Sequence, residues 1–105
     1  MKNKYALITG ASSGIGLEIA RVLASRDFSL VLVARQEEKL KKVAKSLAFE
    51  YRIKADYFLG DLENPHTPKN IYDYCQSKEF SISLLVNNAG YALPDSFHET
   101  SMEDE

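Results

Sequence analysis

Residues 9–16 read Thr-Gly-Ala-Ser-Ser-Gly-Ile-Gly, and this glycine-rich stretch decides how the rest of the chain is interpreted. It follows the apolar run at residues 5–9, which predicts a buried strand, and it precedes apolar residues at helical spacing. Glycines at such a turn let the backbone reverse sharply and let a bulky ligand approach, and free N–H groups at a helix start attract phosphate. The spacing differs from the G-x-G-x-x-G pattern of dinucleotide-binding turns, so these residues alone also permit a turn that only caps the helix.

Apolar runs and helical spacing alternate along the chain. Four short apolar runs predict buried strands at residues 5–9, 29–34, 55–59 and 82–86. The segments between them predict three helices, whose inward-facing residues we expect to be Ile15, Ile19, Val22 and Leu23, then Leu40, Val43, Ala44 and Leu47, then Ile71, Tyr74 and Cys75. We expect Thr67 to cap the third helix, with Pro68 at its first helical position.

This alternation predicts the fold class. Strands that alternate with helices require right-handed crossovers and form a parallel sheet. We therefore expect an α/β fold, part of a Rossmann-type doubly wound parallel sheet with about four strands and flanking helices. A length of 105 residues allows a single domain, residues 1–105.

Arg35 follows the second predicted strand, where dinucleotide-binding folds place the residue that contacts the adenosine ribose. A carboxylate at this point favours NAD, whereas the pair Ala34-Arg35 offers a guanidinium that can bind a 2′-phosphate. The pair therefore predicts that NADP (NADPH) is preferred over NAD. The alternative is that Arg35 only occupies the exposed start of the next helix.

Two further polar segments follow strands at the same predicted edge of the sheet. Asp61-Leu62 comes after the third strand, and Asn87-Asn88-Ala89-Gly90 ends the fourth. Ligands of open parallel sheets bind at this edge, where a carboxylate can accept from adenine and small residues leave room for a ribose. Each segment alone is equally consistent with an ordinary loop start or an Asn/Gly turn.

Together, the glycine stretch, Asp61 and residues 87–90 resemble the classical short-chain dehydrogenase/reductase family in order and spacing. The resemblance implies that Asp61 contacts adenine, with Leu62 also in the cofactor site, and that Asn88, Ala89 and Gly90 support the sheet and line the ribose side of the cleft. It also implies a cofactor diphosphate held by the glycine loop, in which we expect the binding residues Gly10, Ser12, Ser13, Gly14, Ile15 and Gly16.

The same resemblance places the catalytic Asn, Ser, Tyr and Lys of the family beyond the Asn-Asn-Ala-Gly segment, so none is assigned here. Tyr74 and Lys78 have the Tyr-x-x-x-Lys spacing, but they precede that segment, and the apolar pattern turns Tyr74 toward the sheet. We expect residues 1–105 to be the NADP(H)-binding part of a carbonyl/alcohol oxidoreductase, truncated before the catalytic segment. Alternatives are a non-catalytic nucleotide-binding or subunit-interaction module and a non-functional relic.

The amino-acid composition limits the classes of partner that this chain is expected to bind. Thirteen Lys and Arg against 15 Asp and Glu leave a net charge of −2, which argues against nucleic-acid binding. No apolar run approaches the roughly 20 residues that span a membrane. A single cysteine, Cys75, fits a reducing, cytoplasmic compartment, and we expect no metal site. The expected partner is a small-molecule carbonyl or alcohol substrate, and the fourth strand, as an exposed edge, could support self-association.

Overall fold

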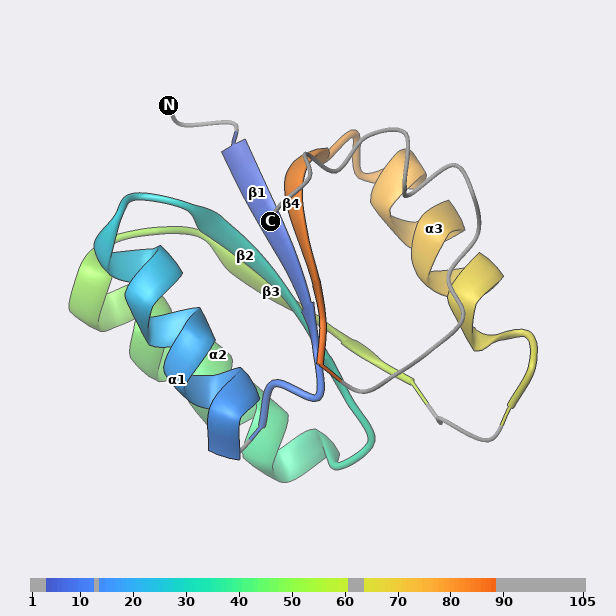
Figure 1. Ribbon diagram of the computed structural model, residues 1–105, viewed down its shortest axis with the longest axis horizontal. Coiled ribbons are helices and arrows are strands. Elements are labelled where there is room, and N and C mark those ends of the chain that lie inside the picture. Colours follow the sequence, from blue (N-terminus) through green and yellow to red (C-terminus); the bar gives the residue numbers. More distant parts are fainter. Residues whose placement is uncertain (1–3, 13, 61–63, 89–105) are drawn as a thin grey trace.

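The fold is a four-stranded parallel sheet with helices on both faces (Figure 1). A computed structural model describes residues 4–12, 14–60 and 64–88. Along the chain its elements are β1 (Lys4–Thr9), α1 (Gly14–Ser25), β2 (Ser29–Ala34), α2 (Glu37–Tyr51), β3 (Ala55–Leu59), α3 (Thr67–Ser77) and β4 (Ser81–Asn87). The strand order is β3-β2-β1-β4, and every pairing is parallel. The predicted α/β fold class is therefore confirmed.

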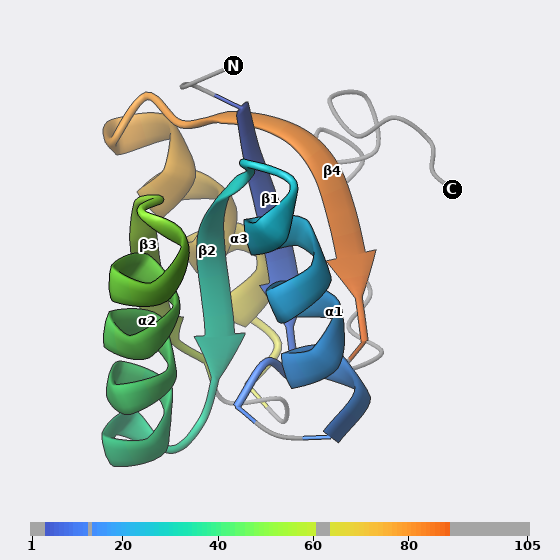
Figure 2. The same cartoon turned by 90° about the vertical axis from the view of Figure 1, so that its left-hand side faces the viewer.

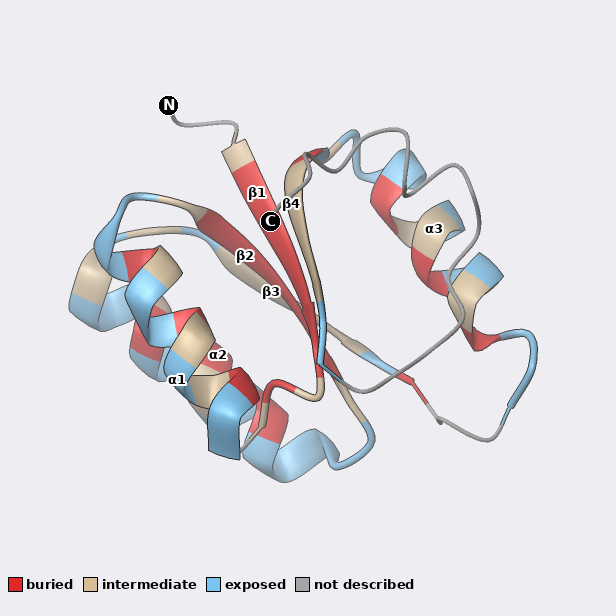
Figure 3. Ribbon diagram, viewed as in Figure 1, coloured by how far each residue is buried: buried red, intermediate tan, exposed pale blue. Residues whose placement is uncertain are grey.

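Helices α1 and α2 cover one face of the sheet and α3 covers the other (Figures 1 and 2). The two central strands divide their side chains between these faces. Ala6, Ile8, Leu30 and Leu32 belong to the core under α1 and α2, and Tyr5, Leu7, Val31 and Val33 belong to the core under α3. Because both faces are covered, β1 and β2 are buried along almost their whole length (Figure 3).

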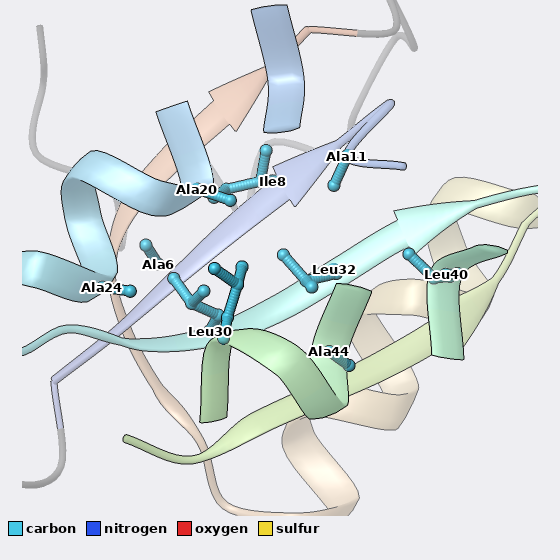
Figure 4. Packing of buried hydrophobic residues seen from close by; sticks show 10 residues of the cluster. Ala6, Ile8, Ala11, Ala20, Ala24, Leu30, Leu32, Leu40 and Ala44 are labelled. Carbon is cyan, nitrogen blue, oxygen red and sulfur yellow. The ribbon is translucent and has the colours of Figure 1, made fainter. Parts of the chain in front are cut away.

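The buried face of α1 differs from the predicted one. The helix buries Gly16, Ala20 and Ala24, whereas Ile15 and Val22, predicted to face inward, are 71% and 50% exposed. Figure 4 shows Ala20 and Ala24 lying over Ile8 and Ala6 of β1. Small residues allow the helix to approach the sheet closely, so the larger apolar side chains move to its flank.

Helix α2 follows the prediction, and α3 follows it with one correction. Leu40, Ala44 and Leu47 are buried in α2, as are Ile71 and Cys75 in α3. The residue at the cap of α3 is His66 and not Thr67, so the helix begins one residue earlier than predicted. The backbone N–H of His66 donates to Asn64 Oδ1 at 2.9 Å, and this turn places the cap at His66, so that Thr67 is the first residue of the helix.

The parallel pairing brings the carboxyl ends of all four strands to one edge of the sheet. Thr9 pairs with Asn87 on one side and with Val33 on the other, and Ala34 pairs with Leu59. The residues that follow these strands are those expected to bind a nucleotide. Within the described parts of the chain, none of the helices has the length and apolar character needed to cross a membrane.

Candidate nucleotide-binding site

The glycine-rich turn between β1 and α1 depends on backbone conformations that glycine adopts most easily. Gly10 and Gly14 have φ angles of +65° and +63°, in the left-handed region where a Cβ is strained. The N–H groups of Gly10 and Ala11 both donate to the carbonyl oxygen of Val33, at 2.8 and 3.2 Å. The turn is therefore fastened to the end of β2, and Ala11 is fully buried beneath it.

Gly14 and Gly16 meet different surroundings. A Cβ added to Gly14 would have no atom within 4 Å, so the side of the turn at this residue is open. A Cβ added to Gly16 would lie 2.0 Å from the carbonyl oxygen of Gly10 and 3.0 Å from Asn88 Nδ2. Gly16 is therefore required for the contact between helix and turn, whereas Gly14 leaves space in which a ligand can approach the backbone.

The end of β4 holds the turn from the opposite side. Thr9 Oγ1 donates to Asn87 Oδ1 at 3.0 Å, and Asn88 Nδ2 donates to the carbonyl oxygen of Gly10 at 3.3 Å. Asn88, predicted as a site residue, is thus in contact with the turn. Thr9 and Asn87 were not predicted to bind each other, because their contact depends on β4 lying beside β1, which nothing in the local sequence reveals.

Arg35 lies at the same edge, one residue after β2 and two after the carbonyl that fastens the turn. The side chain is exposed. The third strand ends beside it, because Gly60 N donates to the carbonyl oxygen of Ala34 at 2.9 Å. The structure therefore brings together the glycine turn, Arg35, the start of the segment after β3 and Asn88. Ser13, Asp61, Leu62, Ala89 and Gly90 lie outside the described residues.

The electrostatics of this edge suit an anion. The first turn of α1, residues 14–17, contains no acidic residue, so the positive end of the helix dipole is not neutralised locally. Ser12 is half-buried in the turn and Ile15 is exposed at the helix start. Backbone N–H groups, a helix N-terminus, an open glycine and a guanidinium at one edge can together bind a phosphorylated ligand.

The Tyr74 and Lys78 pair lies away from this edge and has no geometry for proton transfer. The Tyr74 ring packs on Phe58, with centroids 5.2 Å apart, and Lys78 Nζ lies 5.7 Å from the Tyr74 centroid. Burial, and then the charge of Asp56, raise the pKa of Tyr74 above 10.0. A general base needs the opposite shift, so this pair has a packing role, as its position in the sequence predicted.

Comparison with known proteins identifies the family of this chain. Residues 4–104 match the family model described as short chain dehydrogenase. A very-long-chain 3-oxoacyl-CoA reductase from Eremothecium gossypii is 39% identical over 107 residues, which cover 98% of this chain and 30% of that protein. The chain thus spans about 30% of the length of the curated relatives it matches.

Solved structures similar to this chain include reductases and dehydrogenases with NADPH bound. L-sorbose reductase from Gluconobacter frateurii, complexed with NADPH and L-sorbose, matches with a TM-score of 0.78 and 38% identity, over 83% of this chain and 33% of that one. A short-chain dehydrogenase from Sphingobium yanoikuyae in complex with NADPH matches with a TM-score of 0.75 and 37% identity, over 83% and 34%. Fold, turn geometry and sequence therefore agree that this chain belongs to the short-chain dehydrogenase family.

Proposed function

We propose that residues 1–105 form the NADP(H)-binding part of an oxidoreductase that acts on a small-molecule carbonyl or alcohol. The observation that carries this proposal is the glycine turn, whose open side at Gly14 faces a helix N-terminus free of acidic residues. A Cβ at Gly14 would fill the space that a diphosphate needs, so the residues present fit such a group. When bound, a nicotinamide cofactor supplies a hydride acceptor or donor.

The chain's own residues bind and orient the cofactor in this proposal. The turn holds the diphosphate through its backbone N–H groups, with Arg35 beside the adenosine ribose. Asn88 keeps the turn in position through its bond to the Gly10 carbonyl. The complete set of proposed binding residues is Gly10, Ser12, Ser13, Gly14, Ile15, Gly16, Arg35, Asp61, Leu62, Asn88, Ala89 and Gly90.

Arg35 is the proposed cause of a preference for NADPH over NADH. The residues around the end of β2 are Val33, Ala34, Arg35 and Gln36, with no carboxylate to accept bonds from the ribose hydroxyls. A guanidinium can form two parallel bonds to a 2′-phosphate, which only the phosphorylated cofactor carries. Two structures similar to this chain hold NADPH, which is consistent with this choice.

The proposal leaves proton transfer to residues outside this segment, because the family's catalytic Asn, Ser, Tyr and Lys have no counterparts within residues 1–105. The net charge of −2 supports a small-molecule partner and not a nucleic acid. The single cysteine, buried and without a disulfide partner, supports a cytoplasmic location.

Nucleotide titration tests the proposal. Circular dichroism first establishes that the protein is folded, and quenching of its tyrosine fluorescence then reports binding of NADPH and NADH. We expect tighter binding of NADPH and loss of most of that preference in Arg35→Ala, since a charge-assisted hydrogen bond contributes about 1.5–3 kcal/mol, roughly a tenfold to hundredfold change in affinity.

Arg26→Ala is the matched control, because Arg26 is exposed just beyond the far end of α1. It should leave both affinities unchanged. Equal affinities for the two nucleotides in the wild-type protein would contradict the role of Arg35. No binding of either nucleotide to a folded protein would contradict the proposed function itself.

A further inference from the structure

Helix α2 and the turn that follows it concentrate positive charge. Residues 39–54 contain six Lys and Arg and one Glu, although the chain as a whole has a net charge of −2. All six cations are exposed. The two acidic residues in the first turn of α2, Glu37 and Glu38, lie at the other end of the helix. The rest of α2 and its C-cap therefore form a local basic region.

Phe49 lies in the middle of this basic region. It is 88% exposed, more than Ile15, Val22 or Leu59, and it belongs to neither hydrophobic core. Lys42, Lys45 and Phe49 follow one another at intervals of three and four residues, so they share the side of α2 that faces away from its buried residues. A single exposed apolar side chain needs no explanation by itself, but here its neighbours are cations.

Two adjoining hollows connect Phe49 to cations from α1 and from the C-cap of α2. The first is lined by Ser46, Phe49, Glu50 and Arg52. The second lies between α1 and α2 and is lined by Leu17, Arg21, Lys42, Val43, Ser46 and Leu47. Ser46 lines both hollows, so they form one continuous region. We call Arg21, Lys42, Lys45, Phe49 and Arg52 the basic aromatic surface.

The four cations of this surface have no internal partner. None of them makes an ion pair with a residue in the described ranges, whereas Lys69 on α3 pairs with Asp73 at 3.0 Å. Four unpaired cations around an exposed ring are complementary to a ligand that is both anionic and apolar. A bilayer with anionic lipids has this chemistry, because its headgroups attract Lys and Arg and its acyl boundary accepts Phe.

The composition of the region favours a bilayer over a protein partner. Five of the six cations in residues 39–54 are lysines, a residue that is depleted at protein–protein interfaces. Those interfaces also bury an apolar core, and one isolated ring does not provide such a core. A basic helix face with a Phe side chain is instead typical of segments that lie on a membrane surface.

The position of the surface leaves the nucleotide edge free. Figure 2 shows α2 on the side of β2 and β3, with β4 on the other side of α1. Arg35 precedes the start of α2, whereas Phe49 and Arg52 lie at its end, and a helix of 15 residues is about 22 Å long. A membrane that touches Phe49 therefore does not cover the nucleotide site.

We propose that the basic aromatic surface binds reversibly to a lipid bilayer that carries anionic headgroups. In this arrangement α2 lies parallel to the membrane, the Phe49 ring enters the boundary between headgroups and acyl chains, and Arg21, Lys42, Lys45 and Arg52 contact headgroup phosphates and carboxylates. This mode of binding does not require a helix that spans the membrane. The inference is independent of nucleotide binding.

Co-sedimentation with vesicles tests the proposal, once circular dichroism has shown that the protein is folded. We expect binding to phosphatidylcholine vesicles with about 30% phosphatidylserine, little binding to phosphatidylcholine alone, and release as salt rises from about 0.1 to about 1 M. Phe49→Ala should weaken binding about tenfold or more, because the ring no longer leaves water. Binding of NADPH should be unchanged in this variant.

Matched double variants separate position from net charge. Lys42→Gln with Lys45→Gln should weaken binding about 25-fold, at about fivefold for each charge. Lys69→Gln with Lys78→Gln removes the same charge from α3, on the other face of the sheet, and should change binding little. Arg52→Gly should weaken binding about fivefold without loss of stability, because the C-cap φ of +58° suits glycine.

A spectroscopic readout reports insertion directly. The chain contains no tryptophan, so Phe49→Trp introduces a single reporter whose emission should shift to the blue with the anionic vesicles. Val22→Trp, on the flank of α1, should show no shift. Absence of binding to anionic vesicles, equal binding to neutral vesicles, equal loss in both double variants or an unshifted emission of Phe49→Trp would overturn the proposal. Binding to soluble polyglutamate without binding to vesicles would also overturn it, in favour of an acidic protein partner.

Discussion

The contact of Gly16 with the glycine turn yields a prediction that can be worked out from the structure. In Gly16→Ala the added methyl group would lie 2.0 Å from the Gly10 carbonyl oxygen and 2.9 Å from its carbon. Both atoms belong to the backbone, so the turn must move by more than an ångström to reach ordinary contact. That turn is held by hydrogen bonds from Gly10 N to Val33 O and from Asn88 Nδ2 to Gly10 O.

The cost follows from these contacts. Overpacking costs about 1–3 kcal/mol, and each displaced hydrogen bond contributes about 1 kcal/mol. Alanine recovers up to about 1 kcal/mol through its higher helix propensity. We expect Gly16→Ala to lower the free energy of unfolding by about 2–4 kcal/mol, which moves a urea midpoint by about 1–2 M for a small domain.

Gly14→Ala is the matched comparison. Its methyl group meets no atom within 4 Å, and the only penalty is the positive φ of +63°, which costs about 1–2 kcal/mol. This variant should stay folded but bind NADPH at least tenfold more weakly. Urea denaturation followed by circular dichroism separates the two substitutions. If Gly16→Ala unfolds at the wild-type midpoint, or if Gly14→Ala is the less stable of the two, the packing of the turn against α1 is wrong.

Two further predictions concern the polar and titratable groups of the sheet. Thr9→Val removes, from a fully buried position, the hydroxyl that donates a hydrogen bond to Asn87. We expect this substitution to lower the free energy of unfolding by about 1 kcal/mol in the same urea assay. An unchanged urea midpoint would mean that this hydrogen bond does not stabilise the fold. Burial, and to a smaller extent the charge of Asp56, raises the pKa of the Cys75 thiol from 9.0 to about 12. Folding therefore favours the neutral thiol. The stability that this provides is complete below pH 9 and is lost as the pH rises toward 12. Urea denaturation across this range should show a shallower loss of stability in Cys75→Ala, and parallel curves for the two proteins would contradict the assignment.

Patterns that repeat over several residues predicted the fold well. The continuous apolar runs of β1 and β2 correspond to strands covered on both faces, and Leu40, Ala44 and Leu47 occupy the buried face of α2. Such patterns are reliable because burial selects apolar residues along the whole element. The same reasoning was wrong for α1, where Ile15 and Val22 are exposed. Helical spacing reports which residues are apolar, but the distance between helix and sheet decides which of them fit beneath the helix.

The sequence by itself determined the order of strands and helices, the parallel sheet that this order requires, and the positions of Gly10, Gly14 and Arg35 at the ends of strands. These properties depend on residues close together in the chain. Only the tertiary structure decided that β4 lies beside β1, that Asn88 holds the Gly10 carbonyl, and that Gly16 cannot carry a side chain. These contacts join residues that can be nearly 80 positions apart, and the pairing of distant strands is set by packing of the whole sheet and not by any local pattern.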